Sequence, residues 1–169
     1  MIKERTIEEY AAAYYRGERI SNILLFLIGG GAFTWTLFLF LLRQGNLSSG
    51  LFFSALPFAL FFIITGLYRF IRSLKRFKSV KTEGERFVLT DEKDHLSGRV
   101  ERFKRKRKID QIGVLIGFLL IGIAIFINHN HIFLATSLSI LGFSVTLLVF
   151  DLFGQFRTDE WLRQIHKIK

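Results

Sequence analysis

The sequence has no cysteine and only one proline among its 169 residues. Without cysteine, the chain is neither a disulfide-stapled secreted domain nor a domain folded around a cysteine-ligated metal. It also has no nucleophile-elbow motif, no phosphate-cradling glycine loop and no zinc-protease motif. Half of its residues are apolar, which excludes a disordered chain. These absences leave no sequence motif for a cofactor, a metal ion or a catalytic centre.

The apolar residues are gathered in four long blocks. A helix needs about 20 mostly apolar residues to cross the hydrocarbon layer of a bilayer. The third block reaches that length if Gln111 and Asn128 sit at the two interfaces. So short a chain cannot hide four such blocks from water, so we expect an all-α integral membrane protein with four transmembrane helices. The uncharged runs are Ile20–Leu42, Leu51–Tyr68, Ile112–Ile127 and Ile132–Phe150.

Positive charge is concentrated between the second and third blocks. The segment from Arg69 to Asp110 carries 15 basic and 7 acidic side chains, whereas the two short turns carry almost no charge. Because cytoplasmic loops are enriched in Lys and Arg, we expect both termini and this linker in the cytoplasm, with a bacterial inner membrane favoured over an organelle membrane. The predicted segments are a cytoplasmic N-terminal helix (1–19), a first membrane hairpin (20–69, spans about 20–42 and 51–69), a basic linker with amphipathic helices (70–110), a second hairpin (111–153, spans about 111–128 and 132–153) and an amphipathic tail helix (154–169).

The two halves share this layout of a charged lead-in, two spans and an amphipathic exit. Arg16, Ile20 and Ile23 align with Arg105, Ile109 and Ile112 at an offset of 89 residues. Such a match fits an internal duplication with parallel repeats. It fits equally well the features that any two membrane hairpins have in common, so both interpretations stay open.

A polybasic run directly before the third span is the strongest local signal. Each basic side chain near an anionic membrane surface contributes about 1 kcal/mol of attraction. Two explanations of the run stay open. Either its charge only fixes the orientation of the chain in the membrane, or it binds anionic lipids or a partner protein. The linker is too short for a recognisable nucleic-acid fold, which argues against nucleic-acid binding. The run comprises Arg99, Arg102, Lys104, Arg105, Lys106, Arg107 and Lys108.

Small residues recur inside the spans, where they let helix backbones approach closely in lipid. The same faces can pack the four helices of one chain or join several chains, so a homo-oligomer or a subunit of a membrane complex is expected. The candidate packing residues are Gly29, Gly30, Gly31, Gly113, Gly117, Gly122, Ser139 and Gly142.

The middle of each span contains no ionisable side chain, which argues against an ion carrier or a proton relay. Asp151 ends the fourth run, and we expect it to be a buried polar group paired with Arg69 or Arg157. In the tail helix, Trp161, Ile165 and Ile168 form an apolar side suited to the membrane interface.

These features favour a non-enzymatic membrane protein that acts through lipid and protein contacts, as a scaffold, an accessory subunit or a membrane-shaping element. In its layout of two hairpins, a polar linker and an amphipathic tail, the chain resembles reticulon-type proteins, which implies the membrane-shaping role. The alternatives are an oligomeric pore or membrane-disrupting effector, and, with less support, a lipid-modifying enzyme. The expected ligands are membrane lipids, preferably anionic, with no cofactor and no metal.

Overall fold

The computed structural model describes residues 7–42, 45–87, 91–128 and 130–167, and in this part of the chain it contains helices and no strand. The prediction of an all-helical chain is confirmed. A π-helical turn (Ala124–Asn128) extends the third helix. The helices are α1 (Ile7–Leu41), α2 (Asn46–Phe87), α3 (Lys93–Ile123) and α4 (His131–Lys167).

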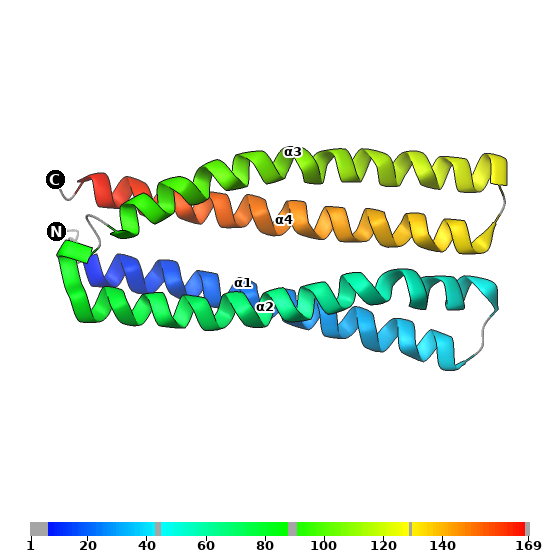
Figure 1. The fold of residues 1–169 in the computed structure, drawn as a ribbon, viewed down its shortest axis with the longest axis horizontal. Helices are drawn as coiled ribbons and strands as arrows, with labels where there is room; N and C mark the ends of the chain where they lie inside the picture. The colour runs from blue at the N-terminus through cyan, green and yellow to red at the C-terminus, as the bar shows by residue number, and fades with distance from the viewer. Residues whose placement is uncertain (1–6, 43–44, 88–90, 129, 168–169) are drawn as a thin grey trace, which may run out of the picture.

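The helices run side by side along the long axis of the molecule (Figure 1). α1 packs against α2, and α3 packs against α4, while α4 also contacts α2 and, over a smaller area, α1. The start of α1, the end of α2, the start of α3 and the end of α4 lie at one end of the bundle (Figure 1). The end of α1, the start of α2, the end of the π-helical turn that follows α3 and the start of α4 lie at the other end.

All four helices are long and apolar enough to cross a membrane, so the chain has the architecture of an integral membrane protein. Their most apolar windows are only 17–22% buried within the bundle. Phe126, Leu115 and Trp35 are among the large side chains left exposed, at 81%, 69% and 63%. Exposed apolar surface of this extent is stable against acyl chains rather than water.

The helices are longer than a bilayer is thick. With a rise of about 1.5 Å per residue, the 42 residues of α2 extend over about 63 Å, roughly twice the hydrocarbon thickness. α2 passes without interruption through the boundary at residue 70, and α4 through the boundary at residue 154. At these two boundaries the apolar part of the helix therefore continues into the polar segment without a break.

We call the end of the bundle that holds the start of α1 and the end of α4 the polar half. It has its own hydrophobic core. Tyr15, Leu96 and Ile165 are almost fully buried there, and Phe77 packs against them. Trp161 and Ile165, expected at the membrane interface, are 2% and 1% exposed in this core, so they hold helices together instead of facing lipid. Ile168 lies outside the described residues. The remaining buried members of the core are Ala11, Tyr14 and Val80.

Some of the small residues lie at helix contacts. A Cβ on Gly29 would meet the Ala59 carbonyl oxygen of α2 at 2.8 Å, and one on Gly117 would meet Leu141 of α4 at 2.9 Å. The backbones at these two positions are therefore too close for a larger residue. The other candidates divide between contacts (Gly113 beside Ser144, and Ser139 with its hydroxyl 2.8 Å from that of Ser54) and positions with nothing within 4 Å (Gly30, Gly31, Gly122 and Gly142).

Candidate functional site

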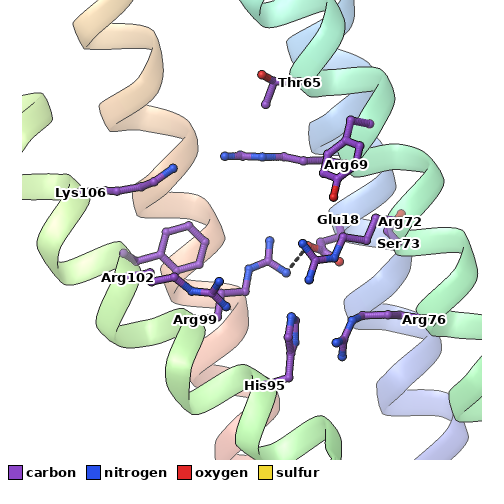
Figure 2. A pocket seen from close by; sticks show the side chains of 12 residues that line it. Glu18, Thr65, Arg69, Arg72, Ser73, Arg76, His95, Arg99, Arg102 and Lys106 are labelled. Carbon is purple, nitrogen blue, oxygen red and sulfur yellow. Dashed lines mark ion pairs between the residues drawn. The ribbon is translucent and has the colours of Figure 1, made fainter.

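A cleft of about 360 Å³ opens on the bundle between α2 and α3, and we call it the basic cleft. Figure 2 shows its side chains reaching into the gap from both helices. Glu18 of α1 is its one acidic lining residue in the described part of the chain. The cationic lining residues are Arg69, Arg72, Arg76, Arg99, Arg102 and Lys106, and the others are Thr65, Tyr68, Ser73, His95 and Phe103.

The six cations form two matching rows. Residues 69, 72 and 76 of α2 have the spacing i, i+3, i+7, and residues 99, 102 and 106 of α3 have the same spacing. This spacing places each row on one face of its helix. Because α2 and α3 run in opposite directions, Arg69 faces Lys106 near the apolar half of the bundle, as Figure 2 shows.

Two of the six cations have carboxylate partners. Arg76 donates to Glu92 Oε2 at 3.1 Å, and Arg99 forms an ion pair with Glu18. Among the described residues, no carboxylate forms an ion pair with the other four cations, although Arg102 Nε donates to the Gly98 carbonyl of its own helix at 3.1 Å. The cleft therefore holds an excess of positive charge from Arg69, Arg72, Arg102 and Lys106.

A polar network at the base of the cleft fixes the partnered arginines. Glu92 is fully buried and accepts a 2.6 Å hydrogen bond from the Tyr15 hydroxyl in addition to the bond from Arg76. Arg99 also donates to the Tyr14 hydroxyl, at 3.1 Å. These bonds tie α1, α2 and α3 together where α2 and α3 otherwise stand apart.

The environment shifts the pKa values of His95, Tyr14 and Tyr15 in the polar half of the bundle. Burial, reinforced by the positive charges of Arg76 and Arg99, lowers the pKa of His95 to about 4. The His95 Nδ1 atom is buried and has no hydrogen-bond partner in the described structure. Burial also raises the pKa of Tyr14 to about 12, and burial with the nearby Glu92 carboxylate raises the pKa of Tyr15.

The structure divides the polybasic run. Only Arg99, Arg102 and Lys106 line the cleft. The other four point elsewhere on α3, where Lys104, Arg105 and Lys108 are exposed and Arg107 is partly buried.

Asp151 is buried in α4, at 4% exposure. Its carboxylate interacts electrostatically with Lys106 and Arg69, but it forms no ion pair with either residue in the described structure. Arg157, the other expected partner, donates instead to the Gly17 carbonyl at 2.9 Å and to the Ser21 hydroxyl at 2.6 Å. Asp151 therefore interacts with Arg69 and Lys106 only at a distance and forms no ion pair with them.

The α2 side of the cleft was not predicted from the sequence. From the sequence, Arg69 was expected only as a possible partner of Asp151, and no role was predicted for Arg72 or Arg76. The signal that would have found them is the shared i, i+3, i+7 spacing of cations on the two segments. Nothing in the spacing shows that the two rows face each other, because that depends on how the helix pairs pack.

Comparison with known proteins finds no family model, no curated protein and no solved structure that matches this chain.

Proposed function

We propose that this protein is a non-enzymatic four-span membrane protein that binds the phosphate groups of anionic lipids in the basic cleft. The observation that carries the proposal is the excess of cations facing one another across a gap between two helices. Like charges held this close repel, and an anion between them removes the repulsion. Guanidinium groups are well suited to this task because they donate paired hydrogen bonds to phosphate oxygens.

The depth of the cleft supports a lipid as the source of the anion. Arg69 is the first charged residue after the uncharged run Leu51–Tyr68, so it stands where the apolar half of α2 ends. In a bilayer that covers this run, the cleft opens at the level of the lipid headgroups. Basic pockets between membrane helices on the cytoplasmic side are typical binding sites for anionic headgroups.

The orientation belongs to the same proposal. We place both termini and the basic cleft in the cytoplasm, as two membrane hairpins with short external turns, because the excess of Lys and Arg lies at that end of the bundle. The exposed cations Lys104, Arg105 and Lys108 then face the anionic leaflet and add a general attraction to the cleft's local binding.

The chemistry of the lining favours binding over catalysis. The Ser73 hydroxyl donates to the Phe70 carbonyl of its own helix at 2.8 Å, so it is not set up as an activated nucleophile. We infer a scaffold, an accessory subunit or a membrane-shaping element, working as a homo-oligomer or within a complex, that holds anionic lipid at the surface of the membrane.

A lipid-competition experiment tests the binding. The protein is reconstituted in nanodiscs of phosphatidylcholine with a minor fraction of phosphatidylglycerol, and retained lipid is measured by native mass spectrometry. We expect phosphatidylglycerol to be enriched on the wild type, and Arg69→Gln with Lys106→Gln to reduce the enrichment strongly. The matched control, Lys104→Gln with Lys108→Gln, removes the same charge from the exposed face and should retain most of it. Equal loss in both double variants would contradict a local site.

The missing cysteines make the orientation directly testable. A single cysteine at Ser97, in the polar half, should react with a membrane-impermeant maleimide only after the cells are opened. One at Asn130, in the turn before α4, should react in intact cells. The opposite pattern would overturn the proposed orientation.

A further inference from the structure

The four cations of the basic cleft that form no ion pair in the described structure make two tiers, each with one residue from α2 and one from α3. Arg69 and Lys106 make the tier nearer the apolar half, and Figure 2 shows them pointing toward each other across the gap. Arg72 and Arg102 make the next tier, three residues along α2 and four residues back along α3. At about 1.5 Å per residue, the tiers stand about 5 Å apart along the bundle axis, close to one helical turn.

Each tier offers the contacts that one phosphate group needs. The four side chains have no carboxylate partner in ion-pair contact among the described residues. In each tier the two cations come from separate helices, so neither tier is complete within one segment. A ligand with one phosphate group would occupy one tier and leave the two facing cations of the other tier without a bound anion.

The charge of the whole site also favours a ligand with two phosphate groups. Four carboxylates act on the six cations of the lining: Glu18 and Glu92 through ion pairs, and Asp110 and Asp151 at longer range. The lining therefore keeps a net positive charge, and a ligand with two phosphodiester groups carries two negative charges that offset it. The cleft volume of about 360 Å³ lies within the range of small-molecule sites.

We propose that the basic cleft is built for one ligand with two neighbouring phosphate groups, one held by Arg69 and Lys106 and the other by Arg72 and Arg102. This inference rests on the proposed function and makes it specific. Two sources supply such a ligand: a lipid headgroup with two phosphates, or a soluble diphosphate.

The experiment compares ligands at equal total concentration of phosphate groups. Purified protein is titrated with tetraoleoyl cardiolipin, with inorganic pyrophosphate at the same concentration, and with phosphatidylglycerol or inorganic phosphate at twice that concentration. Native mass spectrometry is the readout. For the lipid source we expect cardiolipin to bind at 1:1 and at least roughly tenfold more tightly than phosphatidylglycerol, as expected when a second charge-assisted contact is added. Pyrophosphate that binds as tightly as cardiolipin, and more tightly than phosphate, would support the two-phosphate site with a soluble ligand as its occupant.

Variants show whether the preference comes from the tiers. Arg72→Gln with Arg102→Gln should lower cardiolipin affinity to the phosphatidylglycerol level while leaving phosphatidylglycerol bound through the remaining tier. Both side chains are exposed, which favours folding of the variant, and an unchanged melting temperature verifies it. The matched control, Arg105→Gln with Lys108→Gln, should retain the preference.

The failure of this inference is distinguishable from that of the proposed function. Equal affinity for cardiolipin and phosphatidylglycerol, with both lost in Arg69→Gln/Lys106→Gln, would overturn the two-phosphate inference and leave anionic-lipid binding in place. Binding of neither lipid above phosphatidylcholine, and of neither soluble anion, would overturn both.

Discussion

Arg99 of α3 forms an ion pair with Glu18 of α1 across the base of the basic cleft, and the same guanidinium donates to the Tyr14 hydroxyl at 3.1 Å. Both side chains of the pair are largely buried, at 23% and 11% exposure. Through this pair, the first helix holds one cation of the α3 row in place while its neighbours are left without a carboxylate. The pair thus couples the stability of the bundle to the charge of the cleft.

Removing the carboxylate of Glu18 should therefore have two opposite effects. Glu18→Gln leaves Arg99 without its charged partner, and we expect the free energy of unfolding to fall by about 2 kcal/mol. The cleft simultaneously gains one unit of net positive charge, so its affinity for an anionic lipid should rise. Thermal unfolding in detergent measures the first effect, and lipid titration by native mass spectrometry the second. A variant that loses both stability and anion affinity would show that Glu18 shapes the cleft rather than balancing its charge.

Tyr15 should contribute to stability mainly through its hydroxyl. In Tyr15→Phe the fully buried Glu92 loses the 2.6 Å hydrogen bond and keeps only Arg76, so we expect a loss of about 1–2 kcal/mol in chemical or thermal unfolding. Tyr10→Phe is the matched control, because Tyr10 packs against the same core without a hydroxyl hydrogen bond in the described structure. Equal losses in the two variants would assign the effect of Tyr15 to ring packing.

The spans were predictable from sequence because their signal is local. A run of about 20 uncharged residues has few alternatives to a membrane helix, and the runs around Leu25 and Phe143 lie within two such helices. The continuity of the helices was harder to predict. The basic and apolar stretches differ in composition, which suggests a boundary between elements. Both stretches favour helix, however, so one helix runs through the change. The change of composition near Arg69 marks the edge of the apolar region and not the end of α2.

The site was only half predictable for a different reason. The α3 row was found because Lys104 to Lys108 form an unbroken basic run, whereas Arg72 and Arg76 lie in a stretch where basic and apolar residues alternate irregularly. That the two rows face each other is a tertiary fact, set by the packing of α2 and α3 on α4 and not by either segment alone. In the same way, the apolar side of the tail suggests a surface helix, yet Trp161 finds its partners on α1.

The glycines of the first span offer a test of packing with an internal control. A Cβ at Gly29 would lie 2.8–2.9 Å from backbone and side-chain atoms of α2, whereas one at Gly30 would meet nothing within 4 Å. Gly29→Ala should therefore cost about 1–3 kcal/mol of stability, and Gly30→Ala should leave it unchanged or raise it slightly. Melting temperatures of the two variants in the same detergent measure the difference. Equal behaviour would mean that α1 and α2 do not approach each other as closely as the structure shows.

The lowered pKa of His95 should make the stability of the protein depend on pH. Its imidazole faces Arg72 and Arg76 from α2 and Arg99 and Arg102 from α3, and burial together with these charges lowers its pKa to about 4, below the ordinary 6.5. Between pH 6.5 and 4 the unfolded chain binds a proton that the folded chain does not. Stability should therefore be full above pH 6.5 and fall as the pH drops toward 4. His95→Gln should flatten this part of the pH–stability profile.

An anion in the cleft should reverse the shift, because negative charge beside the imidazole favours its protonated form. Titration of the histidine ring protons by NMR, with His95→Gln to assign the signal, should give a pKa near 4 in neutral detergent and a higher pKa with bound cardiolipin. By linkage, lipid affinity should then increase as the pH falls below the pKa of the complex. A pKa near 6.5 without ligand would show that His95 is solvated, and a pKa that cardiolipin leaves unchanged would place the lipid away from the two rows of arginines.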